Sequence, residues 1–299
     1  MNTKYDYNTI LSLQDANDIR SAIRITVVNY MHYQLGWSMQ ACEKRVIMEE
    51  NRTIPKTLFD DLQKRGWHLR GSRLLDVGAG QGGAIIEALD RGADAYGIEP
   101  GEEFLDLAQM RLVDAGHAPD RIRSAYAESL PFPDDHFDYL ISLQVLEHVR
   151  DPFPVLSECY RVLKPGGQCF ISCENYLSFR EQHYRIFWLP MLPKPLGALY
   201  LRSIGRNPDF LNKYVYYTTY PQIWRQIRKV GFENITHDPL LLELQVPTGH
   251  TRGLKRLIST LTSHLPARHR RQVLLPIFHL RNVFKVGVTA VLRKPLPQE

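Results

Sequence analysis

The chain has 299 residues, of which 44% are hydrophobic and 23% are charged. This length allows a sizeable core in one large or two modest domains, and the composition is that of a soluble globular protein. No stretch approaches the roughly 18 apolar residues that a membrane span needs. Early acidic residues argue against a secretory signal, and the four cysteines form no C-x-x-C pair. We therefore expect a cytoplasmic protein.

The net charge of +5 is unevenly distributed along the chain. Residues 251–299 hold ten of the 37 lysines and arginines but only one of the 32 acids. The rest of the chain is therefore slightly acidic. The excess positive charge therefore lies in the C-terminal part of the chain, where we would expect an anionic partner to bind.

In chain order, residues 1–70 are predicted to form a helical cap. Beyond it, β-like and helix-like segments alternate, which favours an α/β domain over 71–299 with a largely parallel sheet. We expect strands at 73–77, 93–99, 121–127, 137–143, 168–174 and 284–293. Helices are expected at 84–92, 101–116, 154–163 and 220–232, and a turn is expected at 164–167.

Two segments interrupt this alternation, and insertions of such size are often functional. Residues 175–220 contain eleven of the 31 aromatic residues, which suggests either a lid over an amphipathic acceptor or an ordinary satellite core. Residues 238–283 are basic and leucine-rich. A helix there could bind an anionic membrane through residues 252–271, or it could simply pack on its own protein.

The stretch "LLDVGAGQGG", residues 74–83, reads G-x-G-x-x-G from Gly78. That pattern is typical of a loop that binds pyrophosphate, but Asp76 stands two residues before it and its charge would oppose a phosphate. A carboxylate here suits a cationic ligand such as the sulfonium of S-adenosylmethionine. Gly83 is assigned to helix packing.

A second carboxylate, Glu99, ends the next predicted strand. From the end of that strand it can accept hydrogen bonds from both hydroxyls of a ribose. This supports an adenosine ligand, whether it belongs to NAD or to S-adenosylmethionine.

Four segments together resemble the class I S-adenosylmethionine-dependent methyltransferases that act on small molecules. They are "LLDVGAGQGG", "YGIEPGEEFLDLAQ", "AESLPFPDDHFDYLISLQVLEHV" and "RVLKPGGQCFIS". The resemblance implies a doubly wound, Rossmann-like sheet of seven strands with an antiparallel last strand. It also implies a cofactor site that comprises Asp76, Gly78, Ala79, Gly80, Glu99, Pro100, Ala127, Glu128, Leu143 and Gln144. Tyr126 stands where many relatives have an acid, so a stacking or wall role is an open alternative for it.

The candidates for acid–base chemistry follow predicted strands. His183, in the aromatic insertion, is the first choice because imidazole titrates near neutral pH. Tyr184 could position or stack on the acceptor. His148 is a further candidate, although each of these side chains could instead serve packing. No metal site is predicted.

The sequence therefore predicts a methyltransferase, most simply one that methylates oxygen on an amphipathic small-molecule, glycosylated or lipid-linked acceptor. One alternative is an RNA or other nucleic-acid methyltransferase that uses the basic end, although "SLQV" after the fourth strand disfavours enzymes that methylate base amines. Another is a subunit that binds S-adenosylmethionine without catalysis. An NAD-dependent oxidoreductase is disfavoured by Asp76. The oligomeric state is not predicted.

Overall fold

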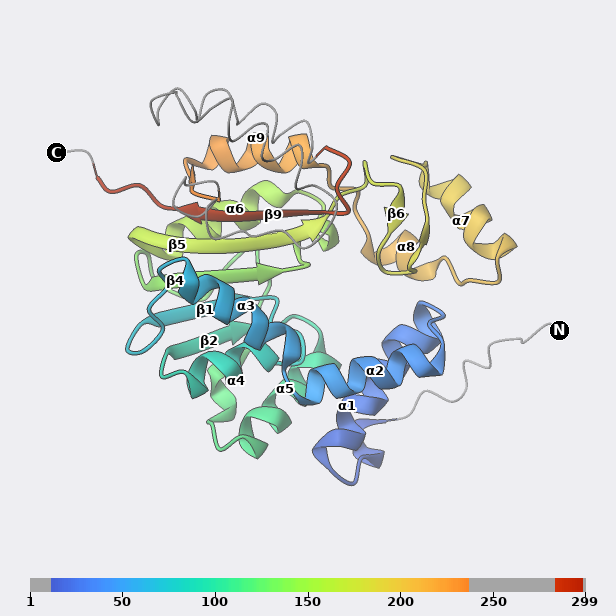
Figure 1. Cartoon of the computed structure of the whole chain (residues 1–299), viewed down its shortest axis with the longest axis horizontal. Helices are drawn as coiled ribbons and strands as arrows, with labels where there is room; N and C mark the ends of the chain where they lie inside the picture. The colour runs from blue at the N-terminus through green and yellow to red at the C-terminus, as the bar shows by residue number, and fades with distance from the viewer. Residues whose placement is uncertain (1–11, 237–282, 298–299) are drawn as a thin grey trace, which may run out of the picture.

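The computed structural model describes residues 12–236 and 283–297. Its main sheet has seven strands in the order β3-β2-β1-β4-β5-β9-β8 (Figure 1). β9 is antiparallel to both of its neighbours, and the pairs from β3 to β5 are parallel. The strands are β1 (Arg73–Val77), β2 (Asp94–Ile98), β3 (Ile122–Arg123), β4 (Phe137–Leu143), β5 (Leu163–Glu174), β8 (Glu233–Asn234) and β9 (Gly287–Arg293). The predicted fold is confirmed.

Helices cover both faces of the sheet because its strands are apolar on both sides. One core cluster joins the sheet to the first group of helices, α3 (Thr53–Lys64), α4 (Gly83–Asp90) and α5 (Glu102–Asp114). The opposite cluster joins it to α6 (Pro152–Val162) and α9 (Tyr220–Val230). This doubly wound arrangement leaves the carboxyl ends of β1, β2, β4 and β5 at one edge, where ligands bind in such folds.

The N-terminal helices and the aromatic insertion lie together beyond that edge (Figure 1). Side chains from both segments share a third core cluster, although more than a hundred residues separate them in the sequence. The N-terminal elements are η2 (Leu13–Asp15), α1 (Ile19–Val27), the π-helix η3 (Val28–Gln34) and α2 (Met39–Glu50). The insertion contributes β6 (Arg180–Glu181), β7 (Ile186–Phe187), α7 (Lys194–Ser203) and α8 (Asp209–Tyr214). Two further short helices are η4 (Pro119–Arg121) and η5 (Leu146–His148).

Three local predictions differ from the structure. The strand expected at 121–127 is reduced to Ile122–Arg123, and the short strand β8 was not predicted. The turn expected at residues 164–167 is wrong: these residues belong to β5, whose pairing with β4 shifts register there. Gly166 supplies the left-handed backbone, with φ of 80°, that this irregular start of the strand requires.

The basic insertion at 238–283, including residues 252–271, falls almost wholly outside the described residues. Within the described ranges, no helix is long and apolar enough to cross a membrane. The domain boundary at residue 70 stays a prediction.

Candidate active site

The glycine loop turns sharply from β1 into α4. The backbone N–H groups of Gly78 and Ala79 both donate to the carbonyl of Ile98, at 3.0 and 2.9 Å, which ties the loop to the end of β2. Gly78 has a φ of 75°, and a Cβ at this position would overlap the Val145 side chain. Only glycine therefore fits at Gly78.

The third glycine of the predicted pattern does not have the role expected of it. Gly83 begins α4, and a Cβ there would lie 3.6 Å from Pro55, which is an ordinary contact. Gly82 is the more constrained residue: its φ is 74°, and an added Cβ would lie 3.0 Å from the Cβ of Ala108 in α5. Close helix packing therefore depends on Gly82.

Asp76 lies at the carboxyl end of β1 and is only 2% exposed. No hydrogen bond or ion pair reaches its carboxylate from the part of the chain that the structure describes. Burial, reinforced by the charge of Glu99, raises the pKa of Asp76 to about 8 from an ordinary value of 3.8. A cationic ligand group would favour the ionised form of this carboxyl.

Glu99 lies next to Asp76 and is fixed by two backbone amides. Its Oε2 accepts from Gly80 N at 2.8 Å and its Oε1 accepts from Gly101 N at 2.9 Å. Burial raises the pKa of Glu99, and these hydrogen bonds oppose the rise. Each oxygen can accept a second hydrogen bond, so the side chain can still bind ribose hydroxyls.

Arg111 stabilises the glycine loop through a hydrogen bond to its backbone, a role that was not predicted. It lies on the buried face of α5 and is 4% exposed. One guanidinium nitrogen donates to the carbonyl of Gln81 at 3.0 Å, and another donates to the carbonyl of Glu49 at 2.7 Å. Arg111 thereby links α5, the loop and the end of α2.

The remaining predicted cofactor residues lie around the same edge. Ala127 is buried, Pro100 and Glu128 are exposed, and Tyr126 is 70% exposed. Leu143 ends β4, and Gln144 follows it with a φ of 57° and donates its N–H to Ser172 O at 2.8 Å. The fold thus brings the predicted residues to the ends of neighbouring strands.

His148 and His183 come together beside this edge, with ring centroids 5.3 Å apart. Nδ1 of His148 lies 2.7 Å from the Tyr214 carbonyl, and Nδ1 of His183 lies 2.9 Å from Glu181 Oε1. Burial, aided by His183, lowers the pKa of His148 to about 4. Although burial lowers it, the pKa of His183 is raised overall by its hydrogen bond to Glu181 and by nearby carboxylates.

Three buried glutamates, at positions 147, 174 and 181, interact with one another, and Glu147 and Glu181 also act on His183. Burial raises the pKa of Glu147 to about 7 and, together with the other two carboxylates, that of Glu174 to about 9. Glu181 also accepts from the hydroxyl of Tyr176 at 3.1 Å. Burial and mutual repulsion therefore favour the protonated forms of Glu147 and Glu174.

Tyr184, the third predicted catalytic residue, does not point its hydroxyl into this cluster. The hydroxyl donates to Asn207 O at 2.7 Å and accepts from Leu211 N at 3.3 Å, while the residue is 1% exposed. These contacts place Tyr184 inside the insertion as a supporting residue.

Comparison with known proteins agrees with this geometry. Residues 75–171 match the family described as a methyltransferase domain. Residues 75–171 therefore form part of a methyltransferase domain. The match begins inside β1 and ends inside β5, so it contains the glycine loop, Glu99 and the η5 turn.

Curated relatives of the methyltransferase domain include the ubiquinone biosynthesis O-methyltransferases of Pseudomonas fluorescens strain SBW25 and Pseudomonas putida strain W619. The first is 41% identical over 112 residues, covering 36% of this chain and 47% of the relative. The second is 42% identical over 111 residues, covering 36% and 46%. The chain spans about half the length of the curated relatives that it matches.

Among solved structures, a candidate sarcosine dimethylglycine methyltransferase from Galdieria sulphuraria superposes with a TM-score of 0.53. It is 18% identical and covers 93% of this chain and 99% of its own. At this identity the likeness concerns the fold alone.

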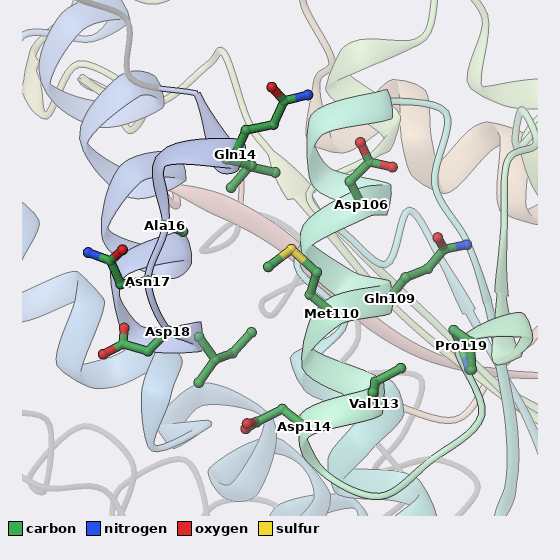
Figure 2. A pocket seen from close by; sticks show the side chains of 12 residues that line it. Gln14, Ala16, Asn17, Asp18, Asp106, Gln109, Met110, Val113, Asp114 and Pro119 are labelled. Atoms are coloured by element: carbon green, nitrogen blue, oxygen red, sulfur yellow. The ribbon is translucent and has the colours of Figure 1, made fainter.

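An open groove of about 810 Å³ lies outside the methyltransferase site (Figure 2). It separates the segment Leu13–Ile19 from the outer face of α5, where Asp106, Met110 and Val113 point toward it. None of the predicted site residues lines this groove. The glycine loop contacts the other face of α5, through Ala108 and Arg111.

The sequence analysis missed the three buried glutamates. Glu147 and Glu174 could have been found, because Glu147 follows one predicted strand and Glu174 ends another, at the edge where sites form in this fold. Glu181 and Arg111 carried no such signal, since their roles depend on contacts with distant segments.

Proposed function

We propose that this chain transfers the methyl group of S-adenosylmethionine to an oxygen atom of an amphipathic small-molecule or lipid-linked acceptor. The buried carboxylate of Asp76, which has no partner within the described residues, carries this proposal. It lies beside a glycine loop that is closed to larger side chains at Gly78. A loop for pyrophosphate would not retain such a charge.

The residues that would hold the cofactor are those at the ends of β1, β2 and β4. Asp76 would face its cationic portion, and Glu99 would accept from the ribose hydroxyls. Ala127 and Leu143 would form apolar walls. The cofactor supplies an electrophilic methyl group, so the protein has to orient an acceptor and manage its proton.

We place the acceptor hydroxyl beside His148 and His183, the two imidazoles where the insertion contacts the η5 turn. Because Nδ1 of each ring faces an oxygen, Nε2 of each can accept a hydrogen bond from a hydroxyl. Removal of that proton makes the oxygen a better nucleophile. Glu181 acts as a positioning residue that orients His183.

Two further observations support oxygen and an amphipathic acceptor. The curated relatives are named as O-methyltransferases of ubiquinone biosynthesis. The insertion also places Phe210 against both histidines, with its ring centroid 5.1 Å from that of His183 and 5.8 Å from that of His148. The membrane contact proposed for residues 252–271 concerns a segment outside the described residues.

The test follows a labelled methyl group from S-adenosylmethionine into phenols and catechols with and without alkyl chains, and locates it by mass spectrometry. We expect label on oxygen, with higher turnover for alkylated acceptors. His183→Ala should lower kcat by about 100-fold or more, as loss of acid–base assistance usually does. The matched control is His68→Ala, an exposed histidine whose backbone N–H donates to the Tyr139 hydroxyl near the start of β4. Label on nitrogen or carbon would overturn the assignment to oxygen, and unchanged turnover in His183→Ala would exclude its role.

A further inference from the structure

Glu147, His148 and His183 converge in a way that hydrogen bonding alone does not explain. Each offers one ligand atom, and the three atoms lie within 4.8 Å of one another. Two come from the η5 turn after β4 and the third from the insertion after β5. The fold therefore assembles one carboxylate and two imidazoles from separate parts of the chain.

Both imidazoles are oriented as metal-binding histidines are. Such a histidine usually donates the N–H that does not face the metal to a carbonyl or carboxylate, which fixes the ring and its tautomer. Here Nδ1 of His148 faces the Tyr214 carbonyl at 2.7 Å, and Nδ1 of His183 faces the Glu181 carboxylate at 2.9 Å. In both rings the nitrogen left for a ligand is Nε2.

The carboxylate of Glu147 is also incomplete. The residue has no exposed surface, and its Oε2 has no hydrogen-bond partner within the described part of the chain. With the Gln144 amide nitrogen facing the acids, it donates at 2.9 Å to Oε1 of Glu147 and to Oε1 of Glu174. Only Oε2 is left, and a buried carboxylate oxygen without a partner is costly unless a ligand supplies one.

The ligand chemistry selects the class of ion. Two imidazoles and one carboxylate suit a first-row divalent ion such as Zn²⁺, whereas Mg²⁺ and Ca²⁺ prefer oxygen ligands. A His₂Glu set leaves a coordination position open for water or substrate. Neighbouring ligand atoms around tetrahedral Zn²⁺ lie about 3.3 Å apart, given bonds of about 2.0 Å, so the side chains would close in on binding.

We propose that Glu147, His148 and His183 bind a divalent transition-metal ion, with Glu181 and the Tyr214 carbonyl orienting the two histidines. The acceptor hydroxyl would bind at the open coordination position of the metal. This metal bond would replace the direct hydrogen bond between the hydroxyl and the imidazoles. A metal-bound hydroxyl loses its proton more readily, and water carries the proton away. This role in catalysis rests on the proposed function, whereas metal binding itself does not.

The test titrates ZnCl₂ into tag-free, full-length protein that has been freed of metal with a chelator. Calorimetry should show one equivalent of Zn²⁺ bound, and Co²⁺ in its place should give visible absorption bands. Glu147→Gln, which keeps the shape of the side chain, and His148→Ala should each weaken this binding by about 10- to 100-fold or abolish it. His68→Ala, at an exposed position, should bind like the wild type.

Binding of S-adenosylmethionine and circular dichroism, measured on the same samples, show that each variant is folded. Equal Zn²⁺ binding by the wild type and by both site variants would overturn the proposed site, even if Zn²⁺ binds elsewhere. Zn²⁺ binding that depends on Glu147 and His148 supports it whether or not methyl transfer is detected. The two proposals can therefore fail separately.

Discussion

Asp76 illustrates how a single buried charge identifies a ligand. Its position two residues before the first glycine of the loop was visible in the sequence, but its burial and its lack of a partner in the described residues were not. Because burial and Glu99 raise the pKa of Asp76 to about 8, the protein without cofactor holds a proton there at neutral pH. The site is thus built for a cation that replaces this proton.

This raised pKa predicts a pH dependence of stability. Between about pH 4 and pH 8, the folded protein keeps the Asp76 proton while the unfolded chain has lost it. The free energy of unfolding should therefore fall as pH rises through this window, by at most about 1.4 kcal/mol per unit from this group, and level off above pH 8. Urea unfolding at pH 5, 6.5 and 8 measures it.

The matched control for this prediction is Asp76→Asn, which keeps the shape of the side chain but cannot ionise. Other buried acids contribute to the pH dependence in both proteins, so the difference between the two isolates Asp76. Parallel curves for wild type and variant would contradict the assigned pKa.

The site residues that could be predicted from the sequence are those whose role follows from their position along a strand. Asp76 and Glu99 stand at strand ends and were predicted as ligand residues. The grouping of Glu181 with His183 and Glu147 could not be predicted, because it depends on how the insertion packs against the η5 turn. The hydrogen-bond partners of a histidine depend on tertiary contacts, which cannot be inferred from the sequence.

Among the elements, α5 joins the cofactor loop to the N-terminal helices. Its helical period was clear from the apolar residues Leu105, Ala108 and Leu112. The same buried face carries Arg111, and a charged residue in that position is normally read as exposed. The strand predicted at 121–127 was too long. Only Ile122 and Arg123 pair with β2, although apolar residues continue to residue 127.

Replacing Arg111 should therefore affect both stability and the loop. Arg111→Met keeps much of the apolar stem but leaves the carbonyls of Gln81 and Glu49 without these donors. We expect a loss of about 2–4 kcal/mol in the free energy of unfolding, since two buried hydrogen bonds from a charged group are removed. Urea unfolding measures it, and affinity for S-adenosylmethionine should fall in the same variant.

Arg20→Met is the matched control, because within the described ranges the Arg20 side chain forms only an exposed ion pair with Glu50 at 3.4 Å. It should change the free energy of unfolding by less than about 1 kcal/mol. If both variants lost the same stability, the linking role of Arg111 would be refuted.

In the whole molecule, the N-terminal helices and the insertion form one cover over the end of the sheet. The indole N–H of Trp37 donates to the carbonyl of His183 at 2.6 Å, although 146 residues separate them. The sequence predicted a helical segment and an aromatic insertion as separate features. The packing of these two segments in one core cluster could not be predicted, because neither segment contains a sequence pattern that indicates contact with the other.

The central claim is that the glycine loop with Asp76 and Glu99 binds S-adenosylmethionine. Calorimetric titration of the full chain with S-adenosylmethionine, and separately with NAD, tests it most directly. We predict saturable binding of S-adenosylmethionine at one site, no comparable binding of NAD, and an affinity at least about tenfold weaker in Asp76→Asn, which corresponds to the loss of one interaction with a charged group. Absence of S-adenosylmethionine binding by the wild type, or preferential binding of NAD, would contradict the account.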